Sequence, residues 1–150
     1  MITIREAAES DRARIDELFA AMLSGIYGNS GTKGYEDGYL DKFFGGRDRI
    51  YAAEAGGKFA GYIAVEVHDG FIYLDDISVD GKFRGQGIGT KLIEAAEMYA
   101  AELGITESVL HVEKANASAQ RLYKRLGYSE SGCDGSRFRM TKKLSDERGE

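Results

Sequence analysis

Three glycines at alternate positions, Gly85, Gly87 and Gly89, lie in the stretch FRGQGIGTKL, residues 83–92. An apolar, strand-like run precedes this stretch and a helix-like run follows it. The first N–H groups of a helix have no partner within the helix, and the helix dipole adds partial positive charge there. Glycines remove the side chains that would keep a phosphate away from these groups. The spacing therefore predicts a phosphate-binding turn, although glycines at such a turn can also serve close packing alone.

The local charge favours the phosphate interpretation. Residues 82–91 contain Lys82, Arg84 and Lys91 and no acidic residue, whereas the whole chain of 150 residues has a net charge of -5. Spacing excludes two phosphate motifs, because no stretch fits the P-loop pattern G-x-x-x-x-G-K-[ST] and the glycines do not follow the dinucleotide pattern G-x-G-x-x-G. The mild acidity of the chain argues against general nucleic-acid binding, which depends on Lys and Arg neutralising phosphates.

The elements that must position this turn are predicted to form one mixed α/β (α+β) domain over residues 1–144, followed by a polar tail over 145–150. Helices are expected from Ser10, which would cap the first one, and at 39–44, 88–103 and 116–126. Strands are expected at 2–6, 50–54, 59–67, 71–79, 106–112, 128–131 and 136–144, the last two ranges giving one or two strands.

The connections predict the topology. A tight turn at 55–58 and a type I′ turn at Asp69-Gly70 favour antiparallel hairpins early in the chain. Later, the helix 88–103 would join two parallel strands. The stretch 24–38 contains five glycines and is predicted to be a long loop, a kind of segment that often binds ligands.

The cysteine content and the N-terminus indicate the cellular compartment in which the protein is expected. Cys133 is the single cysteine and cannot form an internal disulfide. The N-terminus lacks the apolar region of a signal peptide, and no stretch reaches the roughly 20 apolar residues of a membrane span. We therefore expect a cytoplasmic protein without membrane or nucleic-acid partners. His68 is expected to be exposed, His111 to be a core or site residue, and two isolated histidines do not make a metal site.

Two stretches resemble the signatures of one enzyme family. VDGKFRGQGIGTKLIEAAE resembles the acetyl-CoA pyrophosphate loop of the GNAT superfamily of N-acetyltransferases, and Arg84, Gly87 and Gly89 match its pattern [RQ]-x-x-G-x-[GA]. VEKANASAQRLYKRLGY, residues 112–128, is similar to the second signature of that family. The element order is also similar over nearly the whole chain. Gly81-Lys82 stands where many members have Pro-Glu, which we expect to alter the turn and not the site.

The resemblance implies the GNAT fold, with a mixed, mostly antiparallel sheet and two parallel strands that splay apart to admit the cofactor. It implies acetyl-CoA as cofactor and CoA as product. The strand 71–79 would pair with the pantetheine arm, and the turn would hold the pyrophosphate. The residues implied to bind the cofactor are Ile77, Ser78, Val79, Arg84, Gly85, Gln86, Gly87, Ile88, Gly89, Thr90, Asn116 and Tyr123.

The resemblance also implies catalytic roles. Tyr123 matches the family position that commonly protonates the leaving thiolate as general acid; the alternative is a core tyrosine beside Leu122 and Leu126. Asn116 matches a family position that often contacts the cofactor. By its residue type it is also an ordinary helix N-cap, and both roles can hold. An N–H group near Ile77 would stabilise the charge that develops on the acetyl carbonyl oxygen.

Asp75 and Asp76 lie in an otherwise apolar strand, where acids cost free energy unless they face water or a partner. Some family members, including polyamine acetyltransferases, carry an acidic pair here, so we expect one acid to bind or deprotonate an acceptor amine. Because consecutive strand residues point to opposite faces, at most one of the two should face the site. The alternative is a solvated strand end or an ion pair with Lys or Arg.

The acceptor is expected to be a primary amine of a small molecule, with a cationic or polyamine-like amine favoured, or of a peptide. The residues expected on the acceptor side are Tyr27, Tyr35, Glu36 and Asp37. The alternatives are a non-catalytic acyl-CoA sensor, a protein N-terminal or lysine acetyltransferase, a family member using a longer acyl-CoA, and a nucleotide-binding protein of another class. Dimers are common in the family, so a homodimer is possible.

Overall fold

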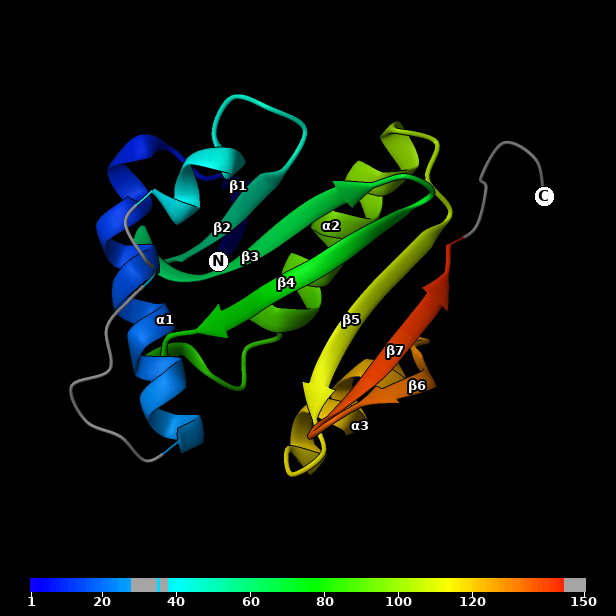
Figure 1. Cartoon of the computed structure of the whole chain (residues 1–150). Coiled ribbons are helices and arrows are strands. Elements are labelled where there is room, and N and C mark those ends of the chain that lie inside the picture. Colours follow the sequence, from blue (N-terminus) through cyan, green and yellow to red (C-terminus); the bar gives the residue numbers. More distant parts are fainter. Residues whose placement is uncertain (28–34, 36–37, 145–150) are drawn as a thin grey trace.

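The structure is a computed structural model that describes residues 1–27, 35 and 38–144, with the backbone alone for 24–27. Within these residues, seven strands form one sheet in the order β1-β2-β3-β4-β5-β7-β6 (Figure 1). Neighbouring strands are antiparallel except β4 and β5, which are parallel, as the sequence predicted. The strands are β1 (Ile2–Glu6), β2 (Arg49–Ala55), β3 (Lys58–His68), β4 (Phe71–Val79), β5 (Glu107–Glu113), β6 (Ser129–Asp134) and β7 (Arg137–Lys143).

Helices cover the two faces of the sheet unequally. Helix α1 (Arg12–Tyr27) and a short 3-10 helix (Tyr39–Phe43) pack on one face, over the half that contains β2 and β3 (Figure 1). Helices α2 (Ile88–Glu102) and α3 (Ala117–Arg125) lie on the opposite face. Among the described residues, no helix is both long and apolar enough to cross a membrane.

Two apolar cores hold these layers together. The larger lies under α2, whose side chains recur every three to four residues and so form one apolar stripe. The buried residues of α2 are Ile88, Leu92, Ile93, Ala96, Tyr99 and Ala100. The smaller core lies under α1 and is formed by Ile15, Leu18, Leu40, Phe43, Ile50, Tyr62 and Ala64. The two cores fix α1 and α2 on opposite faces of the central strands.

The parallel strands separate part-way along their length. β4 pairs with β5 over three rungs, the last of which joins Leu74 to Leu110. β4 then continues to Val79 and β5 to Glu113 without further pairing between them. Figure 1 shows the two strands diverging toward the end of the molecule where α2 begins. We call this end of the sheet the split.

Three local predictions were wrong. Ser10 does not cap the first helix, because the chain enters α1 through a 3-10 turn in which the Ala8 N–H donates to Asp11 Oδ2 at 2.7 Å. The predicted loop 24–38 begins later, because α1 extends to Tyr27. The hairpin at residues 69–70 forms, but no described residue other than glycine has a positive φ, so its turn is not type I′.

Candidate active site

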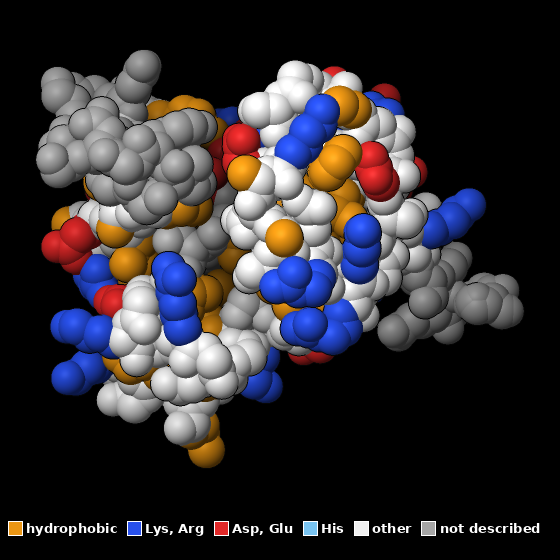
Figure 2. All heavy atoms as spheres, turned by 90° about the horizontal axis from the view of Figure 1, so that it is seen from below, with side chains coloured by type: hydrophobic (Ala, Val, Ile, Leu, Met, Phe, Trp, Pro, Cys, Tyr) orange, Lys and Arg blue, Asp and Glu red, His pale blue; other side chains and the backbone are white. Residues whose placement is uncertain are grey.

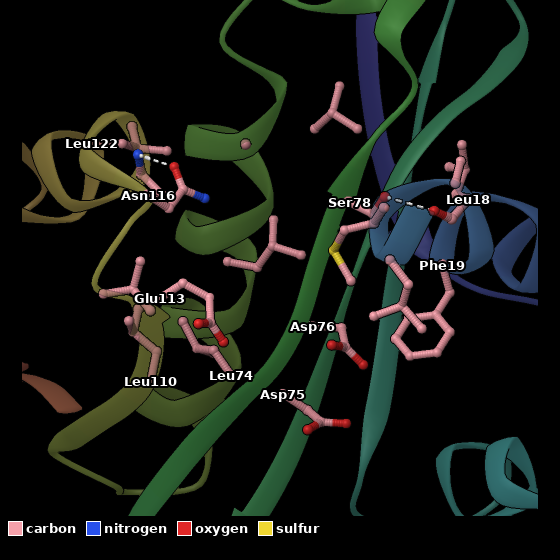
Figure 3. A pocket seen from close by; sticks show the side chains of 18 of the residues that line it. Leu18, Phe19, Leu74, Asp75, Asp76, Ser78, Leu110, Glu113, Asn116 and Leu122 are labelled. Carbon is pink, nitrogen blue, oxygen red and sulfur yellow. Dashed lines mark hydrogen bonds between the residues drawn. The ribbon is translucent and has the colours of Figure 1, made fainter. Parts of the chain in front are cut away.

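A β-bulge in β4 directs two acidic side chains to the same side of the sheet. Leu74 pairs with Val65 and Asp76 pairs with Ala64, so that Asp75 is an extra residue between them. An extra residue redirects the side chains around it. Figure 3 shows both carboxylates pointing toward the α1 side of β4. The prediction that at most one acid would face the site assumed regular alternation, and it was wrong for that reason.

Each carboxylate accepts a short hydrogen bond from a tyrosine. Tyr39 Oη donates to Asp75 Oδ2 at 2.5 Å, and Tyr35 Oη donates to Asp76 Oδ2 at 2.5 Å. The Tyr35 hydroxyl is also 3.0 Å from the hydroxyl of Tyr62. The rings of Tyr35 and Tyr39 stack with their centroids 4.9 Å apart. In the described part of the chain, no Lys or Arg forms an ion pair with either acid, so the pair is not a structural salt bridge.

Burial changes the ionisation of this cluster. It raises the pKa of Asp75, and it raises the pKa of Asp76 to about 7 together with the charge of the neighbouring carboxylate. Burial also raises the pKa of Tyr35 and of Tyr39 well above the usual range, so both phenols remain hydrogen-bond donors. A buried carboxylate pair without a counter-ion is unfavourable until a cation approaches, so this cluster favours a positively charged ligand.

Beyond the last rung that it shares with β5, one edge of β4 is open. On the other edge β4 stays paired with β3, and the Asp80 N–H donates to the Ala60 carbonyl at 2.8 Å. Backbone groups in a strand alternate between its two edges. The N–H and C=O groups of Ile77 and Val79 therefore face the open edge, whereas those of Ser78 face β3. An extended chain with amide groups can pair with that open edge.

The glycine turn ends the same passage. Gly85 and Gly87 have φ angles of +80° and +78°, and Gly87 is the N-cap residue of α2. A Cβ atom added at either position would meet nothing within 4 Å, so the space around the turn is open. The first N–H groups of α2, at Ile88, Gly89 and Thr90, have no helical acceptor. The Ile88 side chain is buried in the core, so it could contribute only its backbone.

A cavity of about 850 Å³ joins the carboxylate pair, the open edge and the turn. Residues of α1, β4, the turn, β5 and α3 line it, and Figure 3 shows them on both sides of the split. The face seen in Figure 2 is hollowed, and Lys and Arg side chains gather on it. Lys82, Arg84 and Lys91, on the turn and the first turn of α2, are exposed. The passage thus has an acidic region and, at the turn, a basic one suited to phosphates.

This arrangement matches a known family. The model of the Acetyltransferase (GNAT) family matches residues 14–128. The chain belongs to this family. It therefore carries an acetyl-CoA-dependent N-acetyltransferase domain with the GNAT fold, as the two sequence signatures indicated.

Curated relatives support the same assignment. The chain is 31% identical over 135 residues to an uncharacterised N-acetyltransferase of Bacillus subtilis, covering 86% of this chain and 91% of that protein. It is 30% identical over 118 residues to streptothricin acetyltransferase of Streptomyces lavendulae, covering 77% of this chain and 62% of that protein. Over 104 residues it is 34% identical to an uncharacterised N-acetyltransferase of Methanocaldococcus jannaschii, covering 65% of this chain and 46% of that protein.

A solved structure has the same fold. The PaiA N-acetyltransferase of Thermoplasma acidophilum, crystallised in complex with coenzyme A, superposes with a TM-score of 0.79. The two chains are 20% identical, and the match covers 96% of this chain and 99% of that one. The predicted α/β GNAT fold, with its mixed sheet and split parallel pair, is therefore confirmed.

The GNAT cofactor fits the passage. GNAT enzymes use acetyl-CoA, which when bound supplies an acetyl group activated as a thioester. The open edge of β4 at Ile77 and Val79 offers backbone groups for amides, and the basic turn from Arg84 to Thr90 offers N–H groups for a pyrophosphate. Exposed Gln86 lies within that turn. Ser78 has its backbone toward β3 and its hydroxyl donates to the Leu18 carbonyl at 3.4 Å, so its backbone groups do not face the open edge as those of Ile77 and Val79 do.

Asn116, the N-cap residue of α3, and Tyr123, within α3, lie on the wall of the cavity across the split from β4. Asn116 caps the helix, because its Oδ1 accepts the Ala119 N–H at 3.1 Å, and it also lines the cavity. Tyr123 lines the cavity too, and it packs edge-on against Tyr128 with ring centroids 6.3 Å apart. Burial, with the nearby charge of Asp76, raises the pKa of Tyr123 to about 12. The Tyr123 phenol is therefore protonated at neutral pH, as a general acid must be.

The predicted acceptor residues have different outcomes. Tyr35 reaches the acidic pair as described above. Glu36 and Asp37 lie outside the described residues, and so does the side chain of Tyr27. Sequence reasoning missed Tyr39, which the pattern YLDKFF places in a helical turn without indicating what its hydroxyl contacts.

The half of the sheet that α1 leaves uncovered carries a second group of polar residues. A recess of about 440 Å³ lies there, lined by residues of β3, β4, β5 and β7. In it, Tyr73 Oη is 2.6 Å from His111 Nδ1, and His111 Nε2 is 2.7 Å from Asp134 Oδ2. His111 also lines the larger cavity. The sequence indicated His111 as a core or site residue but gave no signal for its two partners.

Proposed function

We propose that the chain transfers an acetyl group from acetyl-CoA directly to a primary amine of a small cationic molecule that bears a second positive charge. The observation that carries this proposal is the buried Asp75–Asp76 pair, whose carboxylates both face the cavity without a described basic partner. Such a pair is stabilised by a cation that replaces the lost water. An ammonium group a few carbons from the reacting amine fits that requirement.

The charge of nearby Lys42 acts to lower the pKa of Asp75, but burial outweighs it and the net pKa is raised. Glu66 is bonded to Lys42, with Nζ and Oε2 2.6 Å apart, so that this acid and this base form a closed ion pair. Lys42 also lies 5.0 Å from the centroid of the Tyr39 ring. The stacked rings of Tyr35 and Tyr39 form an aromatic wall beside the carboxylates, and aromatic faces attract cations. The cluster thus favours a compact cation and disfavours an anionic acceptor.

The remaining residues of the site have complementary proposed roles. The N–H groups of Ile77 and Val79 hold the cofactor in line and stabilise negative charge on the carbonyl oxygen. Tyr123 protonates the sulfur that leaves, because its phenol stays protonated at neutral pH and lines the same cavity. The arrangement supports direct transfer, since no described cysteine lines the cavity to carry the acetyl group.

The names of relatives are compatible with this assignment. Streptothricin acetyltransferase is one relative, and thialysine N-epsilon-acetyltransferase of Bos taurus is 45% identical over 56 residues, 37% of this chain and 33% of that protein. These proteins are named for small-molecule acceptors. The acidic pair of this chain extends that inference to an acceptor with two charges.

Thiol release from acetyl-CoA tests the proposal with two amines of equal length. 1,4-Diaminobutane carries a second ammonium group, and butylamine does not. We expect the wild-type chain to acetylate the diamine with a KM at least tenfold lower than that of butylamine. Asp76→Asn should remove this preference while leaving the KM for butylamine unchanged. Asp69→Asn, an exposed acid in the β3–β4 turn, is the matched control.

Other outcomes contradict the proposal in different ways. Equal KM values for the two amines would refute the second cation. Faster turnover of a peptide with a free N-terminal alanine would indicate a protein acceptor. A thermal shift with acetyl-CoA but no thiol release with any amine would indicate a non-catalytic acyl-CoA sensor, and a shift with ATP or NAD instead of CoA would remove the cofactor assignment.

A further inference from the structure

The recess on the uncovered half of the sheet contains a hydrogen-bonded chain that the proposed function does not use. It runs from the Tyr73 hydroxyl to His111 Nδ1 at 2.6 Å, and from His111 Nε2 to Asp134 Oδ2 at 2.7 Å. The chain crosses three strands, since Tyr73 is on β4, His111 on β5 and Asp134 on β6. A carboxylate that accepts from one imidazole nitrogen leaves the other nitrogen as an acceptor. This orientation makes Tyr73 the donor to Nδ1.

The hydrogen-bonded chain of Tyr73, His111 and Asp134 lies beside the split. Tyr73 is one rung before the last paired rung of β4 and β5, and His111 is the first residue of β5 beyond it. Alternation in β4, continued through the bulge, places Tyr73 on the same face of the sheet as the acidic pair. His111 lines both the large cavity and the recess. Tyr73 lines the recess, and its hydroxyl reaches the wall that the recess shares with the larger cavity through its 2.6 Å contact with His111.

We propose that Tyr73 and His111 accept the proton that the reacting amine must lose, and that Asp134 is the positioning residue of this relay. The inference rests on the proposed function, because it needs an amine at the split. The Tyr73 oxygen takes one proton from the ammonium group as its own proton moves to His111 Nδ1. The products are a neutral amine and an imidazolium ion bonded to Asp134. The imidazolium then releases its Nε2 proton to water beside Asp134, and tautomer exchange through solvent moves the remaining ring proton from Nδ1 back to Nε2, which restores the relay.

The acidic pair is less suited to this step than the relay. A carboxylate beside an ammonium group stabilises the charged form of the amine and so opposes deprotonation. Both acids also have a tyrosine hydroxyl bonded to them at 2.5 Å. The Asp134 side chain, in contrast, is 60% exposed and gives the proton a route to water. Burial raises the pKa of Tyr73, which favours a concerted transfer over a free tyrosinate.

Several charged groups surround the His111 imidazole. Acidic and basic side chains come from each neighbouring strand. The hydrogen bond from His111 holds the pKa of Asp134 below its usual range, so the Asp134 carboxylate is ionised at neutral pH. The titratable and charged groups that face the relay are Glu66 and His68 on β3, Asp75 on β4, Glu113 on β5, Asp134 on β6, and Arg137 and Arg139 on β7.

The test is the pH dependence of kcat/KM for 1,4-diaminobutane, compared with the imidazole titrations observed by NMR. The chain has two histidines, so the His111 signals are assigned with His68→Gln, which is also the matched control because His68 lies in the same recess but outside the relay. We expect His111 in the Nε2–H tautomer. We also expect the acid limb of the rate profile to follow the His111 titration.

The variants separate a relay from a merely structural role. His111→Gln and Tyr73→Phe should each lower kcat by about 100-fold, as removal of a general base does, and leave the Kd for CoA unchanged. Asp134→Asn should move the acid limb toward lower pH, because the imidazolium loses its carboxylate partner, and His68→Gln should change neither quantity.

Two results would overturn the relay. If His111→Gln turns over the diamine with the wild-type acid limb, the relay is wrong while the proposed function stands. If the wild-type chain acetylates no amine although it binds CoA, both proposals fail together.

Discussion

Gly87→Ala is expected to weaken CoA binding more than its effect on stability explains. Gly87 has a φ of +78°, and a Cβ atom there would meet nothing within 4 Å, so the substitution adds backbone strain and no clash. A left-handed conformation costs an L-residue roughly 1–2 kcal/mol. The free energy of unfolding should fall by that amount, and Tm by about 2–4 °C per kcal/mol in a chain of this size.

The substitution Gly87→Ala also weakens the affinity for CoA directly. The added methyl group enters the open space before α2, and relaxation of the strain moves the N–H groups that are proposed to bind the pyrophosphate. Loss of one hydrogen bond to a charged group costs about 1.5–3 kcal/mol, and each 1.4 kcal/mol is a factor of about ten in Kd. We therefore expect a rise in the Kd for CoA of about 10- to 100-fold, measured by isothermal titration calorimetry.

Gly57→Ala is the matched control for this prediction. Gly57 lies in the β2–β3 turn with a φ of +82°, and a Cβ atom there also meets nothing within 4 Å. Both variants should lose similar stability, and Gly57→Ala should bind CoA as the wild type does. If the two variants bind CoA within twofold of each other, the glycine turn does not hold the pyrophosphate and the reasoning from its geometry is wrong.

Three further variants test the site from other directions. Tyr123→Phe should lower kcat by about 100-fold with an unchanged KM for acetyl-CoA, since it removes a general acid. An unchanged kcat in steady-state assays would show that Tyr123 only packs in the core. Asp76 ionises near 3.8 in the unfolded chain and near 7 in the folded one, so the folded state binds more protons between these values and the free energy of unfolding falls as pH rises through them. Asp76→Asn should flatten that dependence in urea titrations, and a slope equal to that of the wild type would contradict the burial of its charge. Tyr35→Phe should lower the free energy of unfolding by about 1–3 kcal/mol, because it leaves a buried carboxylate without its donor; differential scanning calorimetry showing no loss would refute the importance of that bond.

The fold could be predicted well from local patterns. The hairpin turns, the apolar stripe of α2 and the order of strands and helices all depend on residues close together in the sequence. The same holds for the glycine turn, because a positive φ and a helix N-terminus are local properties. The errors at Ser10 and at Asp69-Gly70 were also local, and they concerned which of several compatible turn geometries the chain adopts.

The chemistry of the acceptor side could not be predicted in the same way. The hydroxyl partners of the acidic pair are separated from it by 36 and 41 residues in the sequence, and no periodicity indicates such contacts. Tyr73 and Asp134 are separated from His111 by 38 and 23 residues and lie on other strands. Only the pairing of the strands brings these groups together. The family resemblance indicated where the acids are but not that both face one side.

The bulge at Asp75 explains why these groups meet at the split. At Leu74 the pairing of β4 changes on both edges, since the register with β3 shifts there and the pairing with β5 ends. A bulge bends its strand and increases the local twist, so the same extra residue that turns both carboxylates toward α1 also directs β4 away from β5. The open edge proposed for the cofactor and the acidic pair proposed for the acceptor are thus two consequences of one irregularity. The proposed Tyr73–His111 relay spans the point where the pairing of β4 with β5 ends, since Tyr73 is still paired and His111 is not.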